Sequence, residues 1–82
     1  MEKEQILGIV KKHLVNAVEG VSAEQIEGAK SMKDYGASSL DIVEVVSASM
    51  RELKIKIPRN ELSGIKNIDG LADMFCRYAT PQ

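Results

Sequence analysis

The chain has 82 residues, 44% of them hydrophobic, and this length and composition predict a single domain over residues 1–82 with one small core. Its 11 basic and 12 acidic residues give a net charge of -1, which argues against a nucleic-acid-binding protein, because such a protein needs a basic surface. No apolar stretch approaches the roughly 20 residues of a membrane span. The single cysteine, Cys76, excludes an internal disulfide and a cysteine-based zinc site, and it fits the reducing cytoplasm.

The first helix is predicted over residues 2–18. Apolar residues recur there with the 3.6-residue period of one helix face, at Ile6, Ile9, Val10, Leu14, Ala17 and Val18. Gly20 ends this helix.

Residues 20–37 then contain three glycines and few large apolar side chains, which predicts a long loop. Long ordered loops are uncommon and often functional. Inside the loop, Ser31 and Asp34 have capping-box spacing, so we expect a single helical turn that tethers Met32 and Tyr35 to the core.

A second capping box begins the second helix, with Ser38 as N-cap and Asp41 at the third helical position. Apolar residues follow at helical spacing, namely Leu40, Ile42, Val43, Val45, Val46, Met50 and Leu53. The β-branched residues among them would also suit a strand. The capping and a run of about fifteen residues favour a helix, because strands usually last only about 4 to 8 residues.

After this helix, Ile55 and Ile57 alternate with Lys54 and Lys56 and are followed by Pro58. The pattern resembles a strand, but a strand without a partner cannot satisfy its backbone hydrogen bonds. We therefore expect an extended connector that inserts both isoleucines into the core.

A short helical turn is predicted at residues 60–63. Asn67 offers an N-cap for the last helix, which runs to about Ala79 with apolar residues at Ile68, Leu71, Ala72, Phe75 and Tyr78. Residues 80–82 are expected to form a frayed tail. The predicted fold is thus all-α, a small four-helix bundle with three longer helices, one short helix and a long loop between the first two.

Residues 36–41, Gly-Ala-Ser-Ser-Leu-Asp, place Ser39 where the loop turns into the second helix. The first turn of a helix has backbone N–H groups without intrahelical partners and the positive end of the macrodipole. A phosphodiester on Ser39 would therefore lie in favourable surroundings. Taken alone, two serines before a helix are most often only a cap, so the order of the other elements decides.

In the order of its elements, which is helix, long loop, serine motif, helix, connector and closing helix, the chain resembles the acyl carrier protein family along nearly its whole length. The matching residues are Gly36, Ser39-Leu40-Asp41, Val43 and Glu44, the preceding run Ser31-Met32-Lys33-Asp34-Tyr35-Gly36, and Ile57-Pro58. The resemblance implies that a phosphopantetheinyl transferase attaches a phosphopantetheine arm from coenzyme A to Ser39. It also implies a monomeric carrier of acyl thioesters that needs no catalytic base of its own and is not an enzyme.

Two departures from the family pattern bear on the partners. Ser38 stands where the family usually has aspartate, so the cap is kept but one negative charge beside Ser39 is lost. Met50 and Arg51 stand where acids would be expected, and residues 54–59 add three positive charges. Together with residues 58–62 and 66–68, this basic segment resembles the same region of the freestanding carriers of polyketide β-branching cassettes. Those carriers deliver an acetyl group to a hydroxymethylglutaryl-synthase-like enzyme.

The resemblance implies a phosphopantetheinyl transferase as one partner, and acyltransferase, ketosynthase or hydroxymethylglutaryl-synthase-like enzymes of polyketide biosynthesis as others, with fatty-acid partners less favoured. We expect the second helix and the connector to form a docking face, with Ser38, Leu40, Val43, Glu44, Met50 and Ile57 as candidates. Charge reversal of Lys54, Lys56 and Arg59 should then weaken binding of one dedicated partner.

Three alternatives are weighed against this interpretation. A peptidyl carrier shares the modified serine but more often has Gly-Gly where this chain has Gly36-Ala37. A non-carrier helical interaction module explains the periodicity equally well, but not an exposed serine after a long loop. A serine hydrolase is disfavoured, because Gly-x-Ser-x-Gly is absent and no acid can be assigned from sequence to the only histidine, His13.

Overall fold

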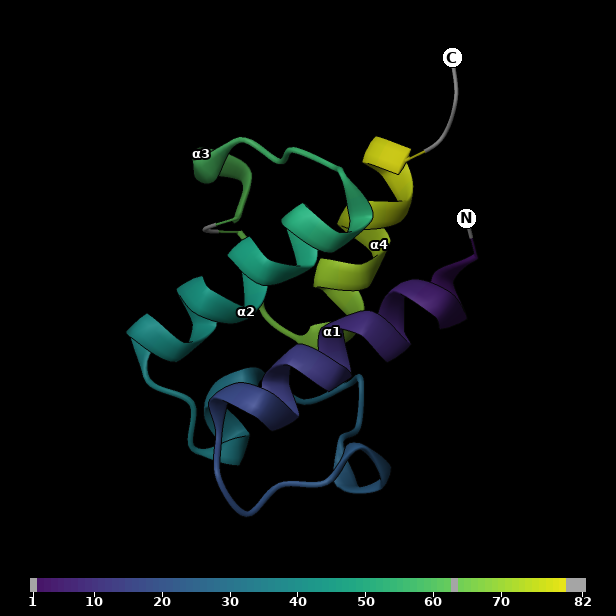
Figure 1. The fold of residues 1–82 in the computed structure, drawn as a ribbon. Coiled ribbons are helices and arrows are strands. Elements are labelled where there is room, and N and C mark those ends of the chain that lie inside the picture. The colour runs from purple at the N-terminus through teal and green to yellow at the C-terminus, as the bar shows by residue number, and fades with distance from the viewer. Residues whose placement is uncertain (1, 63, 80–82) are drawn as a thin grey trace.

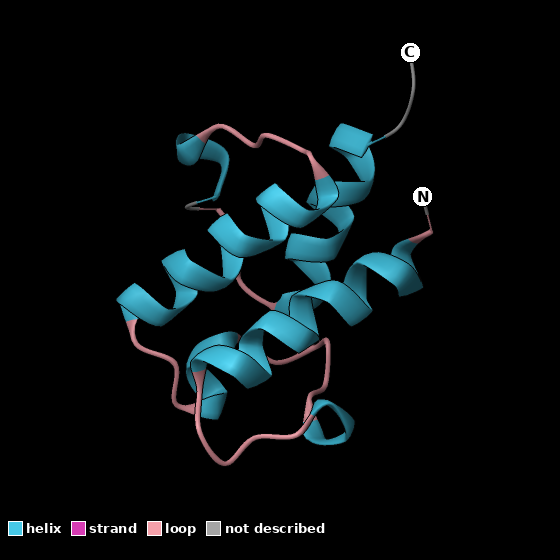
Figure 2. Ribbon diagram, viewed as in Figure 1, coloured by secondary structure: helices cyan, strands magenta, loops and turns pink. Residues whose placement is uncertain are grey.

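The computed structural model describes residues 2–62 and 64–79, and in this part of the chain the regular elements are all helices, joined by loops, without a strand (Figures 1 and 2). The elements are α1 (Lys3–Ala17), the short 3-10 helices η1 (Ala23–Gln25) and η2 (Met32–Tyr35), α2 (Ser39–Leu53), α3 (Arg59–Leu62) and α4 (Ile68–Ala79). The predicted architecture of three longer helices, one short helix and a long first loop is confirmed.

Helix α1 is the central element, because both α2 and α4 pack against it (Figure 1). It begins at Glu2, whose N–H donates to the side chain of Gln5 at 3.4 Å, and it ends where the Val18 N–H donates to Leu14 O at 3.0 Å. Near its start, the Lys3 ammonium lies 3.0 Å from a carboxylate oxygen of Asp73 on α4. The predicted range of this helix is therefore correct to within a residue at each end.

One hydrophobic core lies between these three helices, the connector and the first loop. Helix α1 contributes Ile6, Val10 and Leu14, α2 contributes Val45, Val46 and Leu53, and α4 contributes Ile68, Leu71, Ala72 and Phe75. The two loops add Ile26, Met32, Ala37, Ile55 and Ile57. The insertion of both connector isoleucines into the core is thus confirmed.

The first loop contains more structure than the sequence predicted. The capping box at Ser31 and Asp34 forms η2 as expected, but η1 was not predicted. The signal for η1 was present, since Ser22 and Gln25 have the same spacing and the Gln25 side chain accepts from the Ser22 N–H at 3.1 Å. The short turn expected at residues 60–63 is α3, which begins one residue earlier.

Ser63 and the tail at residues 80–82 lie outside the described residues, so the expected fraying of the tail stays a prediction. None of the helices in the described ranges is long and apolar enough to cross a membrane.

Candidate functional site

The two serines at the start of α2 have different roles. The Ser38 hydroxyl accepts from the Asp41 N–H at 3.2 Å, and an Asp41 carboxylate oxygen accepts from the Ser38 N–H at 3.0 Å, so Ser38 is the N-cap of a reciprocal capping box. Ser39 is the first helical residue and is exposed. Its hydroxyl makes no hydrogen bond to any of the residues that the structure describes, and is therefore not used as a cap.

The turn before the motif directs the chain out of the core. Gly36 adopts the left-handed conformation at φ 89° and ψ 10°, which glycine reaches without strain. Its N–H donates to Lys33 O at 3.0 Å, and the Ala37 N–H donates to Met32 O at 3.3 Å, which is the Schellman pattern of a helix end. Because Met32 and Ala37 are both buried, the turn is anchored directly before Ser38 emerges at the surface.

The long loop is also fixed at a distance from the serine. The Tyr35 hydroxyl accepts from the Glu27 N–H at 2.6 Å and donates to Gln25 O at 3.2 Å. The first two N–H groups of α4, those of Ile68 and Asp69, donate to carbonyls of residues 30 and 28 at 3.0 and 2.9 Å. The loop therefore satisfies helix-end groups that have no intrahelical partner, and in return α4 holds the loop.

The start of α4 is completed by its predicted cap. The Asn67 side-chain oxygen accepts from the Gly70 N–H at 2.7 Å, which confirms Asn67 as the N-cap.

The six predicted interface residues fall into two groups. Around Ser39, the side chains of Ser38, Leu40, Val43 and Glu44 are exposed, and Leu40 and Val43 are large apolar residues with 82% and 57% of their surface accessible. Met50 is half-buried, Ile57 is only 6% exposed, and the Met50 sulfur accepts from the Ile57 N–H at 3.5 Å. The first group is therefore available for a protein contact, whereas the second lines a groove, to whose lining Val43 of the first group also contributes.

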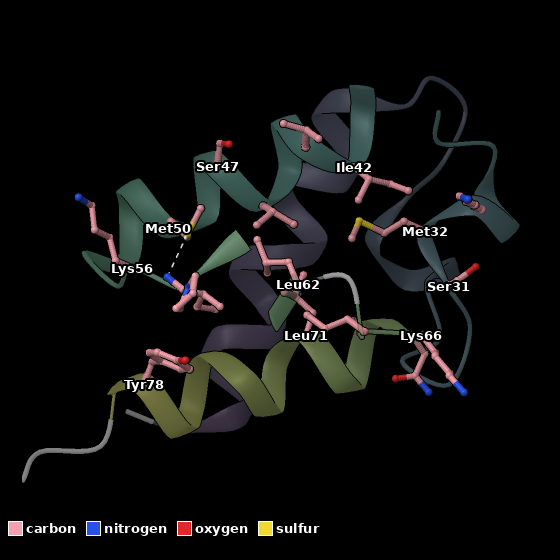
Figure 3. Close-up of a pocket in the computed structure, with 17 residues that line it drawn as sticks. Ser31, Met32, Ile42, Ser47, Met50, Lys56, Leu62, Lys66, Leu71 and Tyr78 are labelled. Atoms are coloured by element: carbon pink, nitrogen blue, oxygen red, sulfur yellow. Dashed lines mark hydrogen bonds between the residues drawn. The ribbon is translucent and has the colours of Figure 1, made fainter. Parts of the chain in front are cut away.

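This groove is bounded by α2, α3, α4 and the connector and has a volume of about 1240 Å³ (Figure 3). Its apolar lining comes from Met32, Ile42, Val43, Val46, Met50, Ile57, Pro58, Leu62, Ile65 and Leu71. Lys33, Lys56, Lys66 and Tyr78 also line it, and no carboxylate does among the described residues. An apolar space of this size can shelter a hydrocarbon chain. Met50 and Ile57 were predicted from the sequence as members of one docking face, but the groove and its α3 and α4 side were not predicted.

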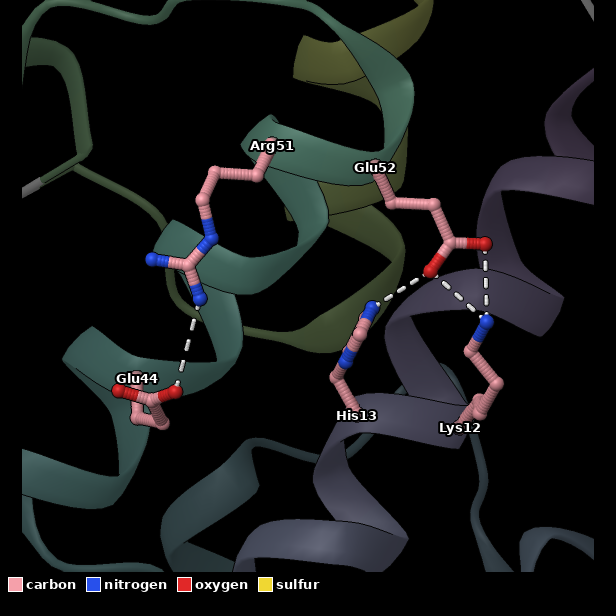
Figure 4. Close-up of polar contacts among 5 residues, drawn as sticks. All are labelled: Lys12, His13, Glu44, Arg51 and Glu52. Atoms are coloured by element: carbon pink, nitrogen blue, oxygen red, sulfur yellow. Dashed lines mark hydrogen bonds and ion pairs between the residues drawn. The ribbon is translucent and has the colours of Figure 1, made fainter.

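His13 is paired with a residue far from Ser39. Its Nε2 lies 2.8 Å from Glu52 Oε1, and the Lys12 ammonium lies 2.7 and 2.8 Å from the two oxygens of the same carboxylate (Figure 4). The hydrogen bond from Lys12, and then that from His13, lower the pKa of the Glu52 carboxyl below its usual value. Ser39 and Glu52 are separated by roughly 20 Å along α2, so this arrangement joins two helices and forms no serine triad.

Cys76 is partly buried on α4. No group of three histidine, cysteine or acidic residues in the described ranges could hold a metal ion.

Comparison with known proteins identifies the family. Residues 12–75 match the family described as "Phosphopantetheine attachment site". The polyketide biosynthesis acyl carrier protein AcpK of Bacillus subtilis is 31% identical over 75 residues, which cover 92% of each chain. The acyl carrier protein of Saccharopolyspora erythraea is 33% identical over 85 residues, covering 98% of this chain and 88% of that one.

A solved structure agrees with these relatives. A chain in the crystal structure of the curacin biosynthetic pathway HMG synthase in complex with acetyl donor-ACP superposes with a TM-score of 0.85 and 38% identity, covering 94% of this chain and 99% of that one. The family match over most of the chain, the two relatives and the shared fold show that this chain belongs to the acyl carrier proteins, the family that carries covalently attached phosphopantetheine.

Proposed function

We propose that the Ser39 hydroxyl is the atom to which the phosphopantetheine arm is attached. The observation that carries this proposal is the division of roles between the two serines, since Ser38 caps α2 and leaves the exposed Ser39 hydroxyl without a partner among the described residues. The phosphate would lie at the N-terminus of a fifteen-residue helix, where backbone N–H groups and the macrodipole favour negative charge. The residues present therefore fit the group.

Attachment needs little from the chain besides presentation of this oxygen. The Ser39 oxygen forms a bond to the pantetheine-side phosphorus of coenzyme A, the pyrophosphate bond to the adenosine half breaks, and the serine proton passes to a base. His13, held by Glu52 far along α2, cannot be that base, so the transferase supplies it. We propose accordingly that the chain is not an enzyme, and that residues 1–82 serve as one monomeric carrier domain.

We further propose that the cargo is an acetyl group delivered in polyketide β-branching, to a hydroxymethylglutaryl-synthase-like enzyme. Support comes from the acetyl donor carrier in the curacin pathway complex and from the polyketide carrier of Bacillus subtilis. Other partners would be the phosphopantetheinyl transferase and the acyltransferase or ketosynthase that loads the thiol. The free thiol of the arm requires a reducing compartment, which supports a cytoplasmic location.

The attachment site is tested by intact mass after incubation with coenzyme A and a promiscuous phosphopantetheinyl transferase. The wild-type chain should gain the mass of one arm, and Ser39→Ala should gain none. Ser38→Ala is the matched control, because it removes the neighbouring hydroxyl and should still be loaded. Loading of Ser39→Ala, or no loading of the wild type, would contradict the proposal.

The cargo is tested with the arm-bearing protein acetylated on its thiol. Incubation with the curacin pathway synthase should remove the acetyl mass, whereas a peptidyl carrier loaded with an aminoacyl group should keep its cargo. Retention of the acetyl group after prolonged incubation would leave the carrier function standing and overturn the acetyl-donor role.

A further inference from the structure

A second hollow lies at the end of α2 farthest from Ser39. It has a volume of about 520 Å³ and is lined by Ser47, Met50, Arg51, Lys54, Ile55 and Lys56, which we call the basic hollow. Three of these six side chains are cationic and none is acidic. Met50 and Ile55 form its apolar floor, and Ser47, Met50 and Lys56 also line the apolar groove, so the two depressions adjoin.

The cations of the basic hollow are poorly neutralised by the chain itself. Lys54 and Lys56 form no ion pair with any described residue, and the Arg51 guanidinium approaches Glu44 only to 3.8 Å between two largely exposed side chains (Figure 4). By contrast, the ammonium groups of Lys3 and Lys12 lie 3.0 and 2.7 Å from carboxylates on neighbouring helices. Three positive charges are therefore gathered at one place, and the ion pair that they make with described residues is the long one from Arg51 to Glu44.

The backbone at Lys54 adds a second observation. This residue has φ 58° and ψ 40°, the only positive φ outside glycine in the described ranges, at the helix-end position where glycine is usual. Its N–H and that of Ile55 both bond to Met50 O, so the conformation is required to end α2. Glycine would adopt it without strain, yet the chain has a lysine, which is one of the residues that line the hollow.

The basic hollow and the serine end of α2 give the helix two poles of opposite charge. Arg51 and Lys54 are about 18 to 22 Å along the axis from Ser39, beside which Asp41 is acidic. Separated charges of opposite sign fix the orientation of one protein on another more than they add affinity. A partner that bound both poles would hold Ser39 facing one direction.

We infer that the basic hollow docks an acidic protein surface on the enzyme that receives the thioester, with a partner apolar side chain against Met50. The inference rests on the proposed function and adds to it the chemistry of the partner surface. A protein surface fits better than a small anion, because three cations and an apolar floor spread over 520 Å³ match several carboxylates around an apolar contact. Of the basic residues suggested by the sequence, Lys54 and Lys56 line the hollow, whereas the side chain of Arg59 lies outside what the structure describes.

The test compares two double charge reversals that change the net charge by the same amount. Lys54→Glu/Lys56→Glu alters the basic hollow, and Lys11→Glu/Arg77→Glu alters two lysine or arginine positions that line neither depression. Each protein is first loaded with the arm, checked by intact mass and by thermal melting, and then titrated with the curacin pathway synthase. Kd is measured by fluorescence anisotropy at low and at raised salt.

The Lys54/Lys56 variant should bind at least about tenfold more weakly than the wild type and lose most of the salt dependence, while the control stays within about threefold. Equal weakening of both variants would show a general charge effect and overturn the inference. The inference would also be overturned if the Lys54/Lys56 variant bound the synthase as tightly as the wild type, or if the wild type did not bind the synthase. Displacement of the synthase from the wild type by inorganic phosphate would indicate a small-anion site and would overturn it as well. In each of these cases, the mass shift at Ser39 reports separately on the carrier function.

Discussion

At the scale of single residues, the adjacent hydroxyls of Ser38 and Ser39 differ in what they contribute to stability. Ser38→Ala removes the acceptor for the Asp41 N–H and should lower the free energy of unfolding by about 1 kcal/mol. Ser39→Ala should leave it nearly unchanged, because its hydroxyl has no partner in the described structure. Urea denaturation checks both values. Ser38→Asp should restore the loss, since aspartate caps equally well and favours the helix dipole, and no recovery would contradict the capping role.

Ser49 is the one buried side chain in the described ranges whose polar atom lacks a hydrogen bond. A hydroxyl that loses water without gaining a partner costs free energy, so Ser49→Ala should be neutral or should stabilise the protein by up to about 1 kcal/mol. Val45→Ala on the same helix is the comparison, and should be destabilising because it leaves a cavity. A loss of more than about 1 kcal/mol in Ser49→Ala would mean that the hydroxyl has a partner after all.

At the scale of elements, the contact between the first loop and α4 depends on a glycine. A Cβ at Gly28 would overlap the Asp69 carboxylate, beside the hydrogen bond from the Asp69 N–H to Gly28 O. Gly28→Ala should therefore displace the Asp69 carboxylate, which is the end of a half-exposed side chain, at a cost of about 1 kcal/mol or less. Gly8→Ala is the matched control, since a Cβ there meets nothing within 4 Å and alanine favours the helix. In an Asp69→Ala background the cost of Gly28→Ala should shrink, and an unchanged cost in the double-mutant cycle would refute the overlap.

The tie between α1 and α2 predicts a pH dependence. Hydrogen bonds from Lys12 and His13 lower the pKa of the Glu52 carboxyl in the folded state. The stability that the ionised carboxylate contributes is therefore fully present above its unfolded pKa of about 4.3, and it is lost as pH falls through the lower folded pKa. Wild type should thus exceed Glu52→Gln in stability at pH 6, and the difference should shrink as pH falls below about 4.3. Glu44→Gln, whose ion pair with Arg51 is long, should show a smaller difference. A difference between wild type and Glu52→Gln that does not change as pH falls would exclude the ion pair as its source.

Sequence patterns predicted the elements that depend on local chemistry, with the exception of η1, and missed the contacts between distant segments. Capping residues and apolar spacing located α1, α2, α4 and η2, because each signal lies within a few residues of the element it specifies. The bonds from residues 28 and 30 to α4, and the pairing of His13 with Glu52, join segments about 40 residues apart, and no local pattern encodes them. For the candidate site, the motif predicted both the Ser38 cap and Ser39 as the attachment residue, but only side-chain geometry showed that the Ser39 hydroxyl has no hydrogen-bond partner among the described residues.

At the scale of the whole molecule, α2 and α4 both pack on α1, and the apolar groove lies where they diverge. An acetyl group uses little of about 1240 Å³, so the groove should accept a longer chain on the same arm. Each methylene removed from water contributes at most about 0.8 kcal/mol, and an open groove gives less. We expect octanoyl on the arm to raise Tm by about 5 °C or more over acetyl, measured by differential scanning calorimetry.

The control for this prediction places a polar side chain in the lining of the groove. Leu62→Asn removes apolar surface from α3 and should lower the Tm of every form, so the informative quantity is the octanoyl-minus-acetyl difference within the variant. That difference should fall to near zero, because the chain would remain in water. If it stayed at the wild-type value, the octanoyl chain would be bound elsewhere on the molecule, and the groove would not be the shelter for the cargo.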